Sequence, residues 1–108
     1  GSLYLDGGLQ VIDTFGFPEE YKPGASAAKD YLDIIKKEDE LEWTFLSPPV
    51  EMHKGTSGKR KAKYRVGLDS PVFDDKRRSV ISVEDLAVAV LDETENAKYI
   101  RKRFTVGY

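Results

Sequence analysis

Serine and histidine could form a nucleophile and its general base if Ser2 or Ser47 lay beside His53, the single histidine of the chain. Neither serine stands in a G-x-S-x-G sequence, which forms the sharp turn that exposes the nucleophile in many hydrolases. The 108 residues contain no cysteine, which excludes disulfides, thiolate metal sites and a cysteine nucleophile. One histidine also cannot supply a histidine-rich zinc site. A hydrolase or a zinc enzyme is therefore not favoured.

A basic stretch from Lys54 to Arg65 could contact phosphate groups, with Tyr64 as its one interleaved aromatic residue. Nucleic-acid-binding domains usually carry a larger positive excess than this chain, whose net charge is −2. A solvated loop is the favoured interpretation. Nucleic-acid binding is kept as a less favoured alternative, which would need Lys59, Arg60, Lys61 and Arg65 to share an exposed face with Arg77 and Arg78.

The two halves of the chain carry opposite charge. Residues 1–53 have a balance of −7 and residues 54–108 a balance of +5. The favoured interpretation is that the halves neutralise each other across one fold. The acidic pair Asp74-Asp75 and the acidic run 38–40 are more typical of solvated turns and helix ends than of metal ligands.

The most promising chemical feature is a strand end. The segment Leu41–Ser47 is aromatic and β-branched, and Pro48-Pro49 stops it. In open α/β sheets, ligands bind at the carboxyl ends of strands, so this end is a candidate binding edge. Neither G-x-G-x-x-G nor a Walker loop occurs in the chain, and no helix signal follows Gly7-Gly8.

Two helices must flank such a strand. The residues 18–20 start a helical stretch, Pro23-Gly24 interrupts it, and an apolar stripe predicts the main helix from about Ala25 to Glu40. The stripe consists of Ala28, Tyr31, Leu32, Ile34 and Ile35. Ser82 is a good N-cap with Asp85 at the third position of a capping box, which predicts a second helix that ends at Asn96.

The strands complete an α/β pattern. We expect residues 41–47 to form a central, parallel strand, residues 63–66 and 72–73 to form a small hairpin, and residues 103–108 to form the last strand, next to the first. Leu32, Ile35, Leu86 and Val90 should pack on the two main strands. A sheet this small leaves both helices with too little to cover, so the sequence predicts part of a larger α/β sheet.

Composition sets the broad class. Hydrophobic residues make up 40% and charged residues 33%, which is typical of a soluble globular protein. No apolar run approaches the roughly 20 residues of a membrane helix, and no signal peptide opens the chain. We expect no membrane partner and a cytoplasmic location.

Several segments together resemble one family. They are residues 1–8 (GSLYLDGG), 16–21 (GFPEEY), 41–48 (LEWTFLSP), 81–85 (ISVED) and 103–108 (RFTVGY). In this order they are similar to the C-terminal half of the atypical short-chain dehydrogenase-like proteins that bind NAD(P)H, described as NmrA-like or as NADH-flavin reductases. The resemblance implies that residues 1–108 are the C-terminal part of one Rossmann-like domain, whose glycine-rich half is absent here.

The resemblance also implies a cofactor site. Ser2 and Leu3 would lie near the nicotinamide ring of NAD(P). Leu46, Ser47, Pro48 and Pro49 would line the nicotinamide-ribose side. The segments 9–23 and 65–73 would border the substrate cleft.

One departure from the family limits the mechanism. Active short-chain dehydrogenases use a Tyr-x-x-x-Lys pair, whereas here Ala25 follows Tyr21 and Ile35 follows Tyr31 at that spacing. The implied function of the intact protein is hydride transfer from NAD(P)H to a flavin-like or quinone-like small molecule, which needs less acid–base help. The alternative is a non-catalytic NAD(P)-binding, redox-sensing regulator. The isolated chain is expected to be inactive, to bind NAD(P) poorly and to self-associate.

Overall fold

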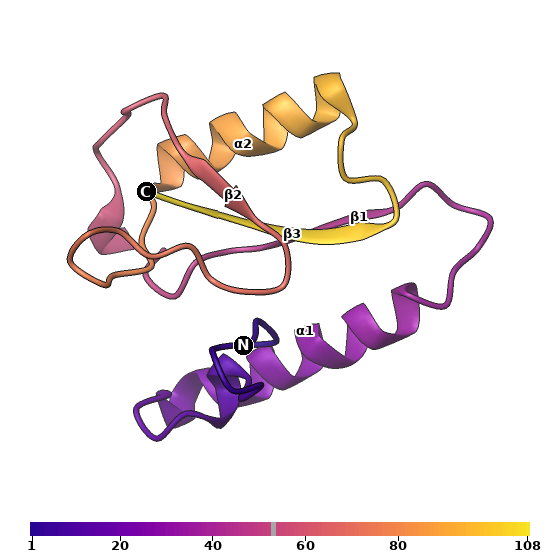
Figure 1. Cartoon of the computed structure of the whole chain (residues 1–108), viewed down its shortest axis with the longest axis horizontal. Helices are drawn as coiled ribbons and strands as arrows, with labels where there is room; N and C mark the ends of the chain where they lie inside the picture. The colour runs from indigo at the N-terminus through magenta and orange to yellow at the C-terminus, as the bar shows by residue number, and fades with distance from the viewer. Residues whose placement is uncertain (53) are drawn as a thin grey trace.

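A computed structural model describes residues 1–52 and 54–108, so His53 and the prediction made for it lie outside the described residues. The helices and strands, in chain order, are η1 (Val11–Asp13), η2 (Glu19–Tyr21), α1 (Lys22–Ile35), β1 (Thr44–Ser47), η3 (Lys54–Thr56), β2 (Arg65–Gly67), α2 (Val83–Asn96) and β3 (Lys102–Gly107). Figure 1 shows α2 and α1 on opposite sides of the strands. Among the described residues, no helix is long and apolar enough to cross a membrane.

The sheet has three strands in the order β1-β3-β2. β1 runs parallel to β3, with Ser47 opposite Thr105, and β2 runs antiparallel to β3, with Gly67 opposite the same threonine. The predicted α/β class and the predicted pairing of the first and last strands are therefore confirmed. The first strand is not central in this sheet, because β3 takes the middle position and β1 lies at an edge.

β3 separates two chemically different faces. Phe104 and Val106 pack with Ile81 and Ala89 into one buried cluster, and Leu46 and Leu86 pack against it. Successive strand residues point to opposite faces, so Arg103 and Thr105 point away from this cluster and toward the α1 side. The predicted packing of Leu86 is confirmed. Val90 was expected on the same face but is exposed, and the small side chain of Ala89 faces the sheet instead.

α1 begins earlier and ends earlier than the sequence predicted. Pro23 lies in its first turn rather than breaking it, because the first helical amides need no carbonyl partner within the helix. The helix ends at Ile35, and residues 36–40 continue as a turn and an irregular segment. Leu32 of the predicted apolar stripe is buried, whereas Tyr31 and Ile34 are exposed.

The predicted hairpin is wrong. β2 pairs with β3, and residues 72–73 form no strand. Two glycines allow the segment around Val72 to lie close to both strands: a Cβ on Gly107 would stand 3.1 Å from Cβ of Val72, and one on Gly67 would stand 2.8 Å from the carbonyl oxygen of Ser70. The close approach replaces the cross-strand pairing that the sequence pattern suggested.

α2 starts and ends as predicted. The Ser82 hydroxyl accepts a hydrogen bond from the Asp85 amide, which is the expected N-cap interaction. The helix ends at Asn96, and Ala97 adopts a left-handed conformation with φ of 48°.

Candidate cofactor and substrate site

A cavity of about 630 Å³ lies at the carboxyl end of β1. This volume is within the range of small-molecule sites, which are mostly apolar with a few polar groups. Its wall includes Leu3, Phe17, Tyr21, Pro48, Pro49 and Glu51. The structure thus brings together three residues predicted for the cofactor (Leu3, Pro48 and Pro49) and the segment 9–23 predicted to border the cleft. The segment 65–73, also predicted there, does not line this cavity.

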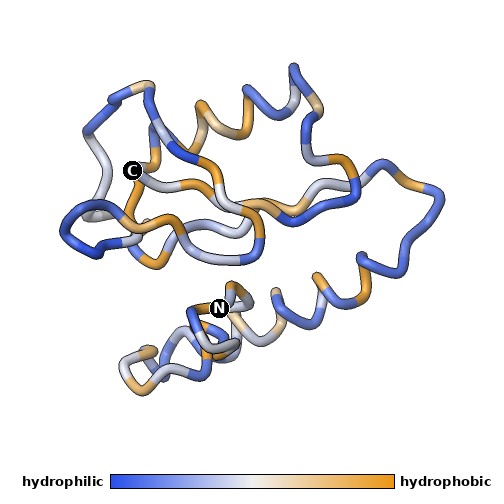
Figure 2. Tube along the Cα trace, viewed as in Figure 1, coloured by the Kyte–Doolittle hydropathy of each residue, from blue (hydrophilic) through white to orange (hydrophobic). Residues whose placement is uncertain are grey.

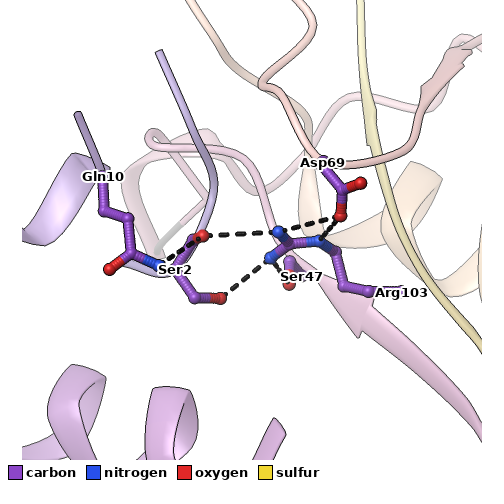
Figure 3. Close-up of polar contacts among 5 residues, drawn as sticks. All are labelled: Ser2, Gln10, Ser47, Asp69 and Arg103. Carbon is purple, nitrogen blue, oxygen red and sulfur yellow. Dashed lines mark hydrogen bonds and ion pairs between the residues drawn. The ribbon is translucent and has the colours of Figure 1, made fainter. Parts of the chain in front are cut away.

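Ser2 and Ser47, also predicted to contact the cofactor, do not line the cavity; both are buried and meet at Arg103. Figure 3 shows the Arg103 side chain reaching both of them. Arg103 Nη1 donates to the Ser2 hydroxyl at 2.8 Å and to the Ser47 hydroxyl at 3.3 Å, and Nη2 donates to the Ser2 carbonyl at 3.3 Å. The Gln10 side-chain amide donates to the same carbonyl at 3.1 Å. These bonds tie the 1–3 segment to the end of β1.

Arg103 is only 4% exposed, and its ionic partner is Asp69. Nε and Nη2 both approach Asp69 Oδ1 at 3.1 Å, while most of the Asp69 side chain remains in water. A planar guanidinium can serve several acceptors at fixed angles, which an ammonium group cannot do. Arg103 therefore acts as a positioning residue for the two serines. Sequence reasoning did not identify it; the available signal was the alternation of polar Arg103 and Thr105 with apolar Phe104 and Val106.

Leu46 occupies a different environment from the other predicted residues. Its side chain packs against the cluster under α2 rather than in the cavity wall. This follows from strand alternation, because neighbours in a strand face opposite sides of the sheet. The side chain of Leu46 is therefore part of the core, and its predicted contact with a cofactor would involve only the backbone.

A second polar cluster joins α2 to the end of the chain. The Tyr108 hydroxyl donates to the buried carboxylate of Asp85 and lies 3.0 Å from the Ser82 hydroxyl. Burial, followed by the hydrogen bond to Asp85, raises the pKa of Tyr108. Burial alone would raise the pKa of Asp85, but hydrogen bonds from Tyr108 and from the amides of Lys61 and Ala62 outweigh it and lower that pKa. The pair consists of a neutral phenol and a carboxylate, which suits a structural clamp rather than proton transfer.

Only some of the basic residues that a nucleic-acid-binding face would need lie together. Lys59, Lys61 and Arg78 line one hollow. Arg65 instead donates to the carbonyls of Tyr108 and Phe73, at 2.8 and 2.5 Å. Among residues 1–52 and 54–108, no group of three or more acidic or histidine side chains could hold a metal ion.

Comparisons with known proteins agree with this fold. No family model matches the chain. It is 40% identical over 108 residues to the uncharacterized protein YwnB of Bacillus subtilis, covering 98% of this chain and 50% of that protein.

Three solved structures superpose closely. A "putative NADH-flavin reductase" from Streptococcus pneumoniae is 35% identical with a TM-score of 0.89, covering 99% of this chain and 51% of that one. A "putative epimerase" from Bacteroides thetaiotaomicron is 41% identical with a TM-score of 0.91, covering 100% and 49%. A "putative exported protein" from Burkholderia pseudomallei is 36% identical with a TM-score of 0.89, covering 100% and 51%.

The chain spans about half the length of each of these proteins. The similarity supports a Rossmann-like α/β fold of the kind found in NAD(P)-dependent oxidoreductases, and it does not single out an NmrA-like subfamily. By sequence and by structure, this chain is similar to half of a protein named as an NADH-flavin reductase.

Proposed function

We propose that residues 1–108 are the C-terminal part of a single NAD(P)-binding domain whose intact form transfers hydride from NAD(P)H to a flavin-like or quinone-like acceptor. The observation that carries the proposal is the cavity at the carboxyl end of β1, because its wall contains Leu3, Pro48 and Pro49. That edge of an open α/β sheet is where ligands bind. The similarity to a protein named as an NADH-flavin reductase supports the same assignment.

The residues of the cavity fit the nicotinamide end of the cofactor. Leu3 and the two prolines offer an apolar wall for a flat ring. Ser2 and Ser47 are buried and do not line the cavity, so their bonds to Arg103 would hold in place the segments that carry this wall. NAD(P)H would supply the hydride when bound. The chain contains no G-x-G-x-x-G sequence, so contacts to the pyrophosphate would come from elsewhere in a longer protein.

Two aromatic residues of the cavity suit a planar acceptor. Phe17 and Tyr21 come from the loop and 3-10 helix before α1 and line the same cavity. Aromatic side chains bury large flat surfaces and stack on other rings. The role of these two side chains is to bind and orient the acceptor, since hydride transfer to a flavin or quinone is the cofactor's own chemistry.

The test fills the cavity in the longer protein that contains this chain. Gly16 lines the cavity, and a Cβ added there would meet nothing within 4 Å. We expect Gly16→Trp to lower kcat/KM for flavin reduction by NADPH at least about tenfold, by occluding the site. Gly24→Trp is the matched control, because Gly24 is equally open and does not line the cavity. Equal activity of both variants and the wild type would refute the proposed site.

A non-catalytic NAD(P)-binding regulator is the second candidate. The observation in its favour is the missing Tyr-x-x-x-Lys pair, since Tyr21 lines the cavity but Ala25 takes the lysine position. The same assay separates the two functions. Saturable NADPH binding without oxidation in the presence of flavins and quinones would support the regulator. The cytoplasmic location stays a prediction.

A further inference from the structure

A second hollow lies at the amino ends of β1 and β3, away from the candidate cofactor site. It has a volume of about 510 Å³, which is within the range of small-molecule sites. Residues near the end of α1, just before β1, just after β2 and at the start of β3 form its wall, among them Lys36, Trp43, Leu68, Asp69, Arg101 and Lys102. We call it the Trp43 hollow. It shares no lining residue with the cavity at the carboxyl end of β1.

The wall of the Trp43 hollow is strongly basic. Among its described residues, four side chains are cationic and Asp69 alone is acidic; the cations are Lys36, Arg101, Lys102 and Arg103. The Asp69 carboxylate is already held by Arg103, whose Nε and Nη2 both approach Oδ1 at 3.1 Å (Figure 3). In the part of the chain that the structure describes, the other three cations form no ion pair. The hollow therefore attracts anions.

The Arg101 guanidinium is held in place by neutral acceptors. Nε donates to the Leu41 carbonyl at 3.1 Å, and Nη2 donates to the Asp39 carbonyl at 2.8 Å. The Arg101 amide donates to the carbonyl of Trp43, which keeps these two residues side by side. Carbonyl acceptors orient the guanidinium without neutralising its charge, so a preorganised positive group stands in the wall.

Trp43 adds a buried donor that lacks a partner. Only 9% of the residue is exposed, and its Nε1–H has no hydrogen-bond acceptor among the described residues. An indole can donate but not accept, and a buried donor without a partner is unfavourable. An acceptor oxygen brought to this wall by a ligand would remove that cost. The indole and Leu68 also give the wall an apolar portion.

We propose that the Trp43 hollow binds a small organic anion in which a carboxylate is attached to an apolar ring. The carboxylate offers acceptor oxygens and a negative charge to Lys36, Arg101 and Lys102, and hydrogen bonds between ionised groups are the stronger ones. The ring packs against Trp43 and Leu68, because flat apolar groups bury large surfaces against an aromatic side chain. This ligand is neither the hydride donor nor the hydride acceptor of the proposed function, whose cavity has a separate wall.

The experiment follows the indole N–H signal of Trp43 by nuclear magnetic resonance in the longer protein that contains this chain. The signal missing from Trp43→Phe is that of Trp43, and the backbone amides of Arg101 and Lys102 are followed with it, so the readout does not depend on that variant. Benzoate, benzamide and acetate are titrated, since benzamide lacks the charge and acetate lacks the ring. We expect benzoate to shift these signals saturably and to bind at least about fivefold more tightly than either other compound.

The lysines of the wall test the recognition of the charge. Lys36→Gln/Lys102→Gln should remove the preference for benzoate over benzamide, and both side chains are exposed, so their replacement leaves the core unchanged. Lys29→Gln/Lys37→Gln is the matched control, because it removes the same charge and neither residue lines the hollow. The control should retain the preference.

Each contrary outcome overturns the inference. No shift of the Trp43, Arg101 and Lys102 signals with benzoate overturns the site. Equal affinity for benzoate and benzamide, or a preference that survives Lys36→Gln/Lys102→Gln, overturns the recognition of an anion, and equal affinity for benzoate and acetate overturns the role of the ring. Oxidation of NADPH is measured separately, so a failure here leaves the proposed function standing and a failure of hydride transfer leaves this site standing.

Discussion

At the scale of single residues, Arg103 shows how a buried charge can organise a binding edge. Removing a guanidinium from water is costly, and the cost is offset only if its donors find acceptors. Here the acceptors are both serine hydroxyls, the Ser2 carbonyl and Asp69. Because Asp69 remains largely in water, the serine contacts contribute more to positioning than the ion pair does.

Replacing Arg103 and Asp69 separately tests whether the serine contacts stabilise the chain more than the ion pair does. We expect Arg103→Met to lower the free energy of unfolding by about 2–3 kcal/mol, because several buried acceptors lose their donor. Asp69→Asn should cost less than about 1 kcal/mol, since its side chain is mostly exposed. Urea denaturation of both variants measures the difference. Equal losses would mean that the ion pair, and not the serine network, carries the stabilisation.

Tyr64 gives a spectroscopic test at the same scale. Burial, together with the hydrogen bond to Asp92, raises the pKa of Tyr64 to about 12. The phenolate absorbance of the folded chain should therefore include a component that titrates near this value, well above the ordinary tyrosine pKa of about 10. Tyr64→Phe should remove this component, and Asp92→Asn should lower its pKa. A late component that is unchanged in both variants would contradict the assignment.

At the scale of elements, the capping residues of α2 also link helix and loop. Asp85 completes the N-cap with Ser82 and binds the backbone of the basic loop of residues 55–62. The pKa of Asp85 is lowered in the folded state. Its contribution to the free energy of unfolding is therefore present above the unfolded pKa of about 3.9 and is lost as the pH falls through the folded value.

Acid unfolding measures this contribution. Between about pH 5 and the acid limit, the free energy of unfolding should fall as the pH is lowered, and Asp85→Asn should flatten that slope. The variant should also be less stable at neutral pH, because an amide cannot accept the same set of hydrogen bonds. Asp33→Asn, at an exposed position in α1, serves as the control and should retain the wild-type slope. An unchanged slope in Asp85→Asn would refute the role of the carboxylate.

Replacing Gly67 of β2 tests how tightly the segment near Ser70 packs against the strand. A Cβ at Gly67 would stand 2.8 Å from a backbone carbonyl, so Gly67→Ala should destabilise the chain by about 1–3 kcal/mol. Gly16→Ala should be nearly neutral, because a Cβ there meets nothing within 4 Å. Thermal denaturation compares the two. Equal melting temperatures would show that the segment near Ser70 moves away without cost.

At the scale of the whole molecule, apolar side chains remain uncovered on several elements. Figure 2 shows hydrophobic residues along the strands and on both helices. Tyr31 and Ile34 of α1 and Val90 and Leu91 of α2 are exposed, as is Phe15 of the first loop. The matched proteins are about twice as long as this chain. Exposed apolar patches commonly mark surfaces that bind other chain segments or proteins.

We expect the isolated chain to self-associate through these surfaces. Sedimentation should show species larger than a monomer, and a hydrophobic dye should bind. Ile34→Lys should reduce the association, because the side chain is 65% exposed and its replacement disturbs no core packing. Asp30→Asn, at an exposed position of the same helix, is the control. A monomer with a sharp cooperative melt and no dye binding would contradict the expectation.

The sequence by itself determined the local elements whose signals are short-range. Ser82 and Asp85 identified the start of α2, and the apolar and β-branched residues 104–106 identified β3. The proline pair after Ser47 marked the end of β1, and the placement of Leu3, Pro48 and Pro49 at one cavity followed from the family resemblance and from the carboxyl-end rule. These predictions depend on capping, on side-chain alternation and on prolines, which act over a few residues.

Only the tertiary structure decided which distant groups meet. Arg103 is separated from Ser2 by 101 residues, and no local pattern reports that their side chains touch. The pairing of β2 with β3, rather than with residues 72–73, depends on how closely the glycines allow a neighbouring segment to approach. The basic loop acquired its place through Glu84 and Asp85, whose carboxylates serve backbone amides more than 20 residues away. Long-range hydrogen bonds and close packing join residues by position in space, so the chain order alone does not specify them.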